Sequence, residues 1–183
     1  MTDTQTLLDT FAGWLRELAD DALALADRLD DESLPTASRE YLAGGLNYLF
    51  KSLDLIPDGI DDIGYLDDAF VLRVAADLAL EECSPTASSE REFGRLGELA
   101  EQTEVLRSFL EEDYGRLEAY VKGLRTGASR GRSAEDIVAD PKVREEMRDD
   151  VRGFARSYEP PGFRKEEKNL VKLKAFFDAK LPR

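Results

Sequence analysis

The sequence predicts an all-α protein, a bundle of about five to seven helices. Apolar residues recur every three or four positions along most of the 183-residue chain, which is the period of an amphipathic helix. No stretch alternates apolar and polar residues for long enough to indicate a β-strand. Segments rich in proline, glycine and acidic residues separate the periodic stretches and indicate where helices end.

The first predicted helix is long and amphipathic. Its apolar positions follow one another in steps of three and four residues: Leu8, Phe11, Leu15, Leu18, Ala22, Leu25 and Leu29. Thr2 followed by Gln5 is typical of a capping box that starts a helix. The polar residues 30–33 and Pro35 predict that this helix ends and that another begins at Thr36.

A central helical hairpin is predicted from a second helix over about Thr36–Leu53 and a third over Tyr65–Glu82. Two glycines at 44–45 weaken helix propensity by roughly 1 kcal/mol each, so they indicate a bend or the close approach of another backbone. The third helix is apolar on nearly all sides, which is typical of the centre of a bundle. Arg73 and Asp77 lie four residues apart in it, where they would form either an ion pair or a solvated edge.

Residues 84–89, rich in serine with one proline, predict a linker. A long fourth helix is predicted over about Ser89–Arg125, along a seam with a period of three and four residues that Thr103 and Asp113 interrupt. The seam consists of Leu96, Leu99, Thr103, Leu106, Leu110, Leu117 and Leu124. Its length, on the order of 50 Å, suits packing along the first helix or a dimer interface. We expect it to pack on the hairpin within one chain.

Three regions follow from these segments. Residues 1–125 are predicted as the main bundle and residues 126–133 as a flexible linker, because glycine and serine lower order and arginines resist burial. Residues 134–183 are predicted as a C-terminal helical layer, with one helix beginning at Asp140-Pro141 and ending before residues 160–162. The final helix combines an apolar face of Leu170, Leu173, Phe176, Phe177 and Leu181 with the basic residues Lys165, Lys168, Lys172 and Lys180.

The charge distribution excludes some classes of function. The net charge is −14, and Met1–Cys83 contains 5 basic and 19 acidic residues, whereas Arg164–Arg183 contains 7 basic and 3 acidic residues. An acidic body repels phosphates, so we expect no nucleic-acid binding. The chain has no histidine, which removes the usual general base and zinc ligand. With no catalytic constellation visible, a non-catalytic role is favoured over an enzymatic one.

Cys83 is the only cysteine, so the chain cannot form an internal disulfide, and this thiol is predicted to pack at a helix end. No apolar run approaches the roughly 20 residues of a membrane-spanning helix. The first residues lack the basic and apolar pattern of an export signal. These features together predict a cytoplasmic protein with no transmembrane segment.

The most specific stretch is the acidic break over residues 53–68, which holds six carboxylates, one proline and two glycines between two apolar helices. One interpretation is structural, because the unpaired N–H groups at a helix start attract carboxylates. The capping candidates in this interpretation are Asp58, Asp61, Asp67 and Asp68.

The other interpretation of the acidic break is a divalent-cation site for Mg²⁺, Ca²⁺ or Mn²⁺, which prefer carboxylate oxygens. Asp54, Asp58, Asp67 and Asp68 are the candidate ligands. An EF-hand alignment beginning at Asp54 fails, because Ile56 occupies its third position and Tyr65 its twelfth. The identity of any metal stays open.

Two blocks within this stretch, Asp54-Leu-Ile-Pro-Asp58 and Gly64-Tyr-Leu-Asp-Asp68, resemble the YkvA-like domain-of-unknown-function family. The resemblance covers roughly residues 41–80. It implies a compact helical hairpin and no agreed activity. The chain departs from the family pattern at Gly59 and at residues 61–62, where relatives tend to be apolar or to carry a second proline, so we expect a more flexible and more acidic loop.

Three functions are therefore weighed. We favour a non-catalytic structural or protein-interaction module, acting on a protein partner or through self-association. The first alternative is a divalent-cation-binding protein that uses the acidic break. The second is peripheral association with a membrane surface through the basic amphipathic C-terminal helix. The same helix could instead dock onto the acidic N-terminal half of the chain. Of these two alternatives, we expect docking.

Overall fold

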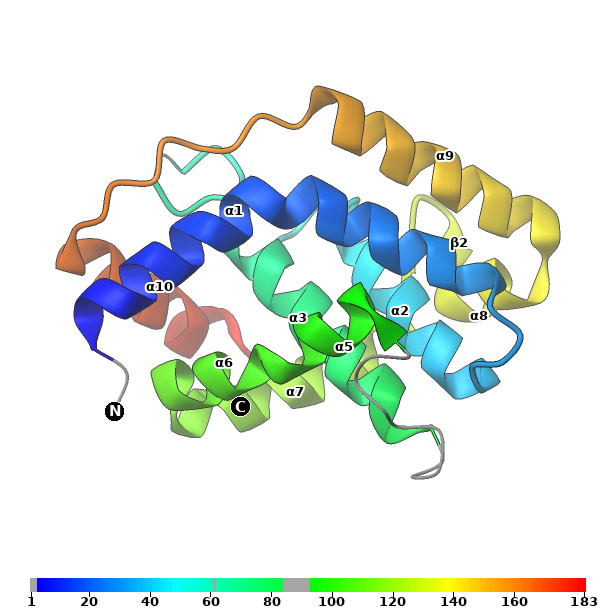
Figure 1. Cartoon of the computed structure of the whole chain (residues 1–183), viewed down its shortest axis with the longest axis horizontal. Coiled ribbons are helices and arrows are strands. Elements are labelled where there is room, and N and C mark those ends of the chain that lie inside the picture. The colour runs from blue at the N-terminus through cyan, green and yellow to red at the C-terminus, as the bar shows by residue number, and fades with distance from the viewer. Residues whose placement is uncertain (1–2, 61, 84–92) are drawn as a thin grey trace.

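The computed structural model describes residues 3–60, 62–83 and 93–183, and it confirms the all-α class. The chain folds into a helical bundle, and a two-stranded hairpin is the only β-structure in the described ranges (Figure 1). The elements are α1 (Thr4–Asp27), η1 (Arg28–Asp30), α2 (Thr36–Tyr48), α3 (Leu66–Glu81), α5 (Arg95–Glu101), α6 (Thr103–Leu110), α7 (Glu112–Gly123), β1 (Ala128–Ser129), β2 (Arg132–Ser133), α8 (Ala134–Ala139), α9 (Pro141–Ser157) and α10 (Glu167–Lys180).

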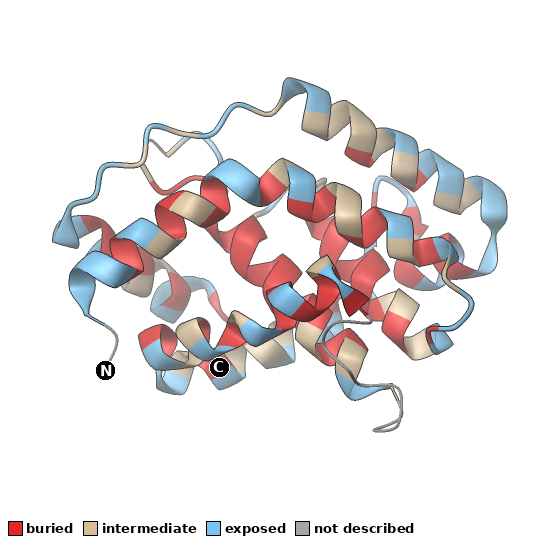
Figure 2. Cartoon of the chain, viewed as in Figure 1, coloured by how far each residue is buried: buried red, intermediate tan, exposed pale blue. Residues whose placement is uncertain are grey.

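The hairpin of α2 and α3 forms the centre of the bundle, as predicted. Nearly every residue of α3 is buried, and Figure 2 shows this helix almost entirely in the colour of buried residues. The two helices approach closely, because a Cβ atom built on Gly45 would lie 2.7 Å from the Cβ of Ala75. The glycine therefore permits the close approach of the two backbones that the sequence indicated. α2 ends at Tyr48, several residues before the predicted end at Leu53.

The core continues from α3 to α1 through aromatic rings. The ring centres of Phe11 and Phe70 are 5.1 Å apart, and those of Phe11 and Phe109 are also 5.1 Å apart. α1 begins with Asp3, whose side chain accepts hydrogen bonds from the backbone N–H groups of Gln5 and Thr6. Asp3 thus takes the capping role predicted for Thr2, which lies outside the described residues.

The long helix predicted over Ser89–Arg125 was wrong, because its described part is divided into α5, α6 and α7. The backbone breaks near Gln102 and at Glu111, which has a φ of +54°. The breaks let each short helix turn toward α3, which all three contact. The predicted linker over residues 84–89 lies outside the described residues.

Two alternatives were open for Arg73 and Asp77, an ion pair with each other or a solvated edge, and the structure shows neither, because Arg73 is fully buried and both residues pair with other helices. Arg73 instead pairs with Asp21 of α1 at 3.2 Å. Asp77 pairs with Arg107 of α6 at 3.1 Å. Both residues of α3 therefore connect this helix to its neighbours.

Residues 126–133, predicted as a flexible linker, contain the β1–β2 hairpin. The amide of Asn47 donates a hydrogen bond to the carbonyl of Arg132 at 2.9 Å. The hydroxyl of Ser129 donates to the carbonyl of Phe50 at 2.9 Å. Arg132, expected to resist burial, is 8% exposed and pairs with Asp150 at 2.7 Å. This segment is therefore ordered against the end of α2.

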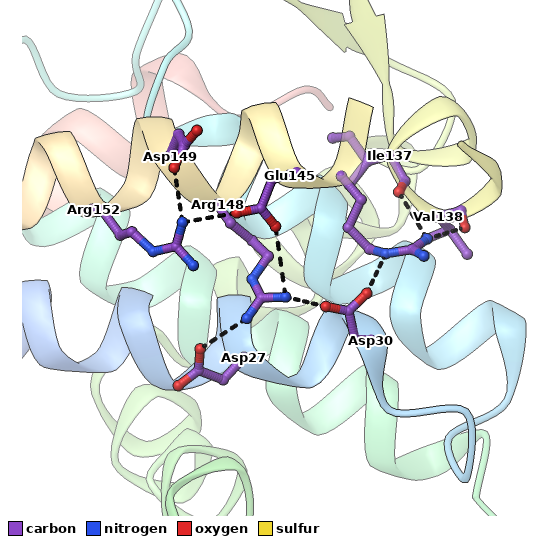
Figure 3. A network of polar contacts seen from close by, with 9 residues as sticks. Asp27, Asp30, Ile137, Val138, Glu145, Arg148, Asp149 and Arg152 are labelled. Carbon is purple, nitrogen blue, oxygen red and sulfur yellow. Dashed lines mark hydrogen bonds and ion pairs between the residues drawn. The ribbon is translucent and has the colours of Figure 1, made fainter. Parts of the chain in front are cut away.

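The helix α9 lies along α1 on the outside of the bundle, and ion pairs connect the two helices (Figure 3). Arg148 pairs with Asp30 and, at 3.6 Å, with Asp27. Arg144 pairs with the same Asp30 at 2.5 Å. Met147 and Val151 of α9 are buried, and Val143 and Phe154 are half-buried against the core, so apolar packing and ion pairs both attach this helix.

The apolar face of α10 is buried within the same chain. Leu170, Leu173, Phe177 and Leu181 are buried, and Phe176 is half-buried. The ring of Phe177 stacks on Phe70 of α3 with centres 5.3 Å apart. In the described residues, no helix combines the length and the hydropathy needed to span a membrane.

Candidate functional site

The described part of the connector between α2 and α3, residues 49–60 and 62–65, turns tightly around Gly64. Its N–H donates to the carbonyl of Ile60 at 2.9 Å, and Ile60 donates to Pro57 at 3.0 Å. A Cβ atom at position 64 would lie 2.4 Å from the carbonyl oxygen of Asp58, so only glycine fits there. Tyr65 follows with a φ of +66°, a conformation that a non-glycine residue adopts rarely. The connector is thus a defined joint between the two helices.

Asp67 holds this connector against the end of α2. Its Oδ2 atom accepts hydrogen bonds from the Tyr48 hydroxyl at 2.5 Å and from the Ile56 N–H at 3.0 Å. The Tyr48 oxygen in turn accepts the N–H of Leu55 at 2.7 Å. Asp67 therefore satisfies a connector amide, and the N-cap position of α3 is Tyr65, which makes no side-chain capping bond.

Asp67 and Asp68 are the most deeply buried members of the predicted site. Asp67 is 0% exposed and Asp68 is 3% exposed. One oxygen of each, Oδ1 of Asp67 and Oδ2 of Asp68, is buried without a hydrogen-bond partner. Burial raises the pKa of Asp67 to about 7, and burial together with the neighbouring Asp67 charge raises the pKa of Asp68 well above its usual value.

Asp54 and Asp58 lie nearer the surface, Asp54 half-buried and Asp58 exposed. Loss of solvent and the charge of Asp58 raise the pKa of Asp54 to about 6, against the opposing charge of Lys51. Nearby protein atoms exclude part of the water around the Asp58 carboxyl, which raises its pKa as well. The charges of Asp54 and Asp58 contribute to the raised pKa values of Asp67 and Asp68, so the four carboxyls share one region.

A comparison with Asp21 shows what this site lacks. Asp21 is also fully buried, but it lies between Arg73 at 3.2 Å and Arg95 at 2.6 Å. Burial raises the pKa of Asp21, and both guanidinium groups counteract that rise. Among the described residues, by contrast, none of the ion pairs includes Asp54, Asp58, Asp67 or Asp68.

The two other acidic residues of the connector do not complete a ligand set. Asp62 lies 3.8 Å from Arg164, and Asp61 is outside the described residues. In the part of the chain that the structure describes, no three acidic or cysteine side chains stand where they could hold a metal ion. The predicted ligands therefore share a region without converging on one point.

A hollow of about 370 Å³ opens beside Asp58. Its walls come from the connector, the β-hairpin and α9, and they include Phe50, Tyr65, Arg130, Asp150 and Phe154. Sequence reasoning found Asp58 but missed the rest of these walls. The sequence shows aromatic residues in the connector and in α9, but it does not show that these two segments lie side by side.

No protein-family model, curated protein or solved structure matches this chain. The resemblance of residues 54–58 and 64–68 to the YkvA-like family stays a prediction. Any function must therefore be argued from the connector and the hollow beside it.

Proposed function

We propose that the protein is a non-catalytic interaction module that binds a positively charged segment of a partner protein through the acidic connector. The observation that carries this proposal is that Asp54 and Asp58, beside the buried Asp67 and Asp68, take part in none of the ion pairs of the described residues. Like charges held together raise the free energy of the folded protein. A basic group from outside would lower it.

The connector divides its carboxyls between two roles. Asp67 holds the backbone of the joint through Ile56 and Tyr48, so it is unavailable to a partner. Asp54 and Asp58 remain accessible. Leu53, one residue before Asp54, is 85% exposed, which is unusual for a large apolar side chain in this molecule. An apolar anchor next to accessible carboxylates suits a partner segment that carries both basic and apolar side chains.

The proposal is tested with a fluorescein-labelled peptide of alternating lysine, arginine and leucine, measured by fluorescence anisotropy at 50 mM and 300 mM NaCl. We expect Asp54→Asn with Asp58→Asn to weaken binding at least fivefold. The matched control is Asp20→Asn with Asp178→Asn, which removes the same charge from exposed positions elsewhere. If both double variants weaken peptide binding equally, the binding reflects the overall negative charge of the protein, and the proposal is overturned.

A second candidate function is the binding of Mg²⁺, Ca²⁺ or Mn²⁺ at the same carboxyls. The buried oxygens of Asp67 and Asp68 that lack partners favour it, because a buried carboxylate oxygen without a donor is costly. A cation would offset that cost. It would also have to draw Asp54 or Asp58 inward, since three ligands do not yet converge within the described residues.

Thermal unfolding with and without 5 mM of each cation tests this second candidate. A ligand at 100 times its dissociation constant stabilises the folded state by about 2.7 kcal/mol, which would raise the melting temperature by several degrees. Asp58→Asn with Asp68→Asn should abolish the rise, and Asp20→Asn should retain it. An unchanged melting temperature of the parent protein in all three salts would reject the cation site.

A further inference from the structure

We infer that the hollow beside Asp58 binds a guanidinium group, the side chain of an arginine in the partner segment. The inference rests on the proposed function and names the chemistry that the partner must present. The hollow has two walls of similar composition. The wall at Phe50 and Asp150 already holds the guanidinium of Arg130, and the other wall includes Tyr65, Phe154 and Asp58.

The first wall shows how a guanidinium is held. The guanidinium carbon of Arg130 lies 4.6 Å from the centre of the Phe50 ring. Its Nη1 atom lies 3.2 Å from Oδ2 of Asp150. An aromatic face and a carboxylate thus hold one planar cation together, which is the usual combination for arginine.

The second wall offers the same two components without a cation. The ring of Tyr65 lies 6.3 Å from that of Phe154 and 5.2 Å from that of Tyr158. Asp58, an exposed residue, lines the same hollow, and none of the ion pairs of the described residues includes it.

The other carboxyls of the hollow already have partners. Asp149 pairs with Arg152 at 2.7 Å, and Asp150 pairs with Arg130 and with Arg132. Asp58 is therefore the carboxyl of the hollow that is left for an incoming cation. A guanidinium can lie flat on Tyr65 or Phe154 and pair with Asp58 through two N–H groups, whereas an ammonium lacks both the plane and the fork.

The test uses three acetylated peptide amides with the sequence Ala-Leu-X-Leu-Ala, in which X is arginine, lysine or citrulline. Citrulline keeps the shape of arginine and removes its charge. Binding is measured by isothermal titration calorimetry on the full chain. We expect the arginine peptide to bind at least fivefold more tightly than the lysine peptide, and the citrulline peptide to bind at least twentyfold more weakly than the arginine peptide.

Two variants locate the site. Asp58→Asn and Phe154→Leu should each weaken binding of the arginine peptide at least fivefold. Asp149→Asn, which changes an already paired carboxyl of the same hollow, and Phe163→Leu, which changes a half-buried ring outside it, should leave binding within twofold. Asp58 is exposed, so its substitution does not threaten the fold.

The outcomes separate this inference from the proposed function. Suppose that the arginine and lysine peptides bind equally, that Phe154→Leu binds as the parent does, and that Asp58→Asn binds more weakly. That result would overturn the guanidinium site and would retain a connector that binds positive charge. Equal binding of the citrulline and arginine peptides, or unchanged binding by Asp58→Asn, would overturn the inference as well. Absence of binding by both charged peptides would count against both proposals.

Discussion

Asp21 and Asp68 are both buried aspartates whose pKa values are raised by burial, but only at Asp21 do cations counteract that rise. Asp21 receives two guanidinium groups, from Arg73 and Arg95, so its charged form is compensated. Asp68 has Asp67 as its neighbour and a buried oxygen without a partner. The free energy of the charged carboxylate is therefore much higher at Asp68, and its protonated form is favoured in the folded protein.

This difference predicts how stability changes with pH. The folded protein binds protons at Asp67 and Asp68 more tightly than the unfolded chain does, because both folded pKa values are raised, that of Asp67 to about 7. Stability should therefore fall as the pH rises from about 4 through 7, by on the order of a few kcal/mol. Asp68→Asn should flatten this fall in urea unfolding at pH 5, 6, 7 and 8. Asp20→Asn, at an exposed position, should follow the parent protein, and a parent curve that rises over this range would contradict the expected sign.

Gly45 tests the close contact at the centre of the bundle. Gly45→Ala would bring a Cβ atom to 2.7 Å from the Cβ of Ala75, so α2 and α3 would have to separate. We expect a loss of stability of roughly 1–3 kcal/mol despite the better helix propensity of alanine. Gly153→Ala in α9 is the matched control, because nothing lies within 4 Å of its added Cβ, and it should be neutral or stabilising. A stabilising Gly45→Ala in urea unfolding would show that the two helices tolerate a wider spacing.

At the scale of elements, α9 illustrates how a mostly polar helix is held in one position. Arg148 reaches across to Asp27 and Asp30, whereas Arg152 pairs with Glu145 and Asp149 of its own helix (Figure 3). Of these two sets, only the contacts of Arg148 reach outside α9. Since α9 also carries Phe154, this attachment maintains one wall of the hollow.

Arg148→Gln should therefore loosen α9, whereas Arg152→Gln should not. Side chains of Arg148 and Asp30 are 21% and 45% exposed, so the pair is partly screened and we expect a loss of roughly 0.5–1 kcal/mol. Hydrogen exchange of the amides in residues 147–157 should accelerate in Arg148→Gln and stay close to the parent rate in Arg152→Gln. Equal acceleration in both variants would mean that contacts within α9 matter more than those to α1.

The helices themselves were largely predictable, because apolar periodicity reports which face an element buries. The breaks near Gln102 and at Glu111 were not, since Thr103 and Asp113 only interrupt the apolar seam beside them and neither break holds a proline or glycine. The hairpin over residues 128–133 was missed for a related reason. It depends on hydrogen bonds from Asn47 and to Phe50, which lie far away in the sequence. Local composition indicates flexibility there, and distant partners override it.

At the scale of the whole molecule, the candidate site was predictable in part. The density of carboxylates in residues 53–68 identified Asp54, Asp58, Asp67 and Asp68, and the fold brings them into one region. Their different roles depend on burial and on partners such as Tyr48, which no local pattern reveals. The hollow beside Asp58 needs three segments from different parts of the chain, so only the tertiary structure could reveal it.

The C-terminal helix α10 contacts α1 and α7, and its docking bears on the choice between a membrane-surface role and a structural one. Phe177 stacks on Phe70 and is completely buried, whereas Val171 of the same helix is 64% exposed. Arg116 of α7 secures the helix end through the carbonyls of Asp178 and Leu181. An apolar face that is already occupied leaves little for a lipid bilayer to bind.

Phe177→Ala should cost roughly 3–5 kcal/mol in urea unfolding, because it removes a buried ring and leaves a cavity. Val171→Ala should change stability by less than about 0.5 kcal/mol, since its side chain is exposed. In flotation with vesicles of phosphatidylcholine and phosphatidylserine, the parent protein and Val171→Ala should remain unbound, because the basic residues of α10 surround a face that Phe70 covers. If Phe177→Ala binds these vesicles and the parent does not, the released face has membrane affinity that docking normally suppresses. Salt-sensitive binding by the parent itself would instead show that α10 leaves the bundle at low cost, which the stacking on α3 argues against.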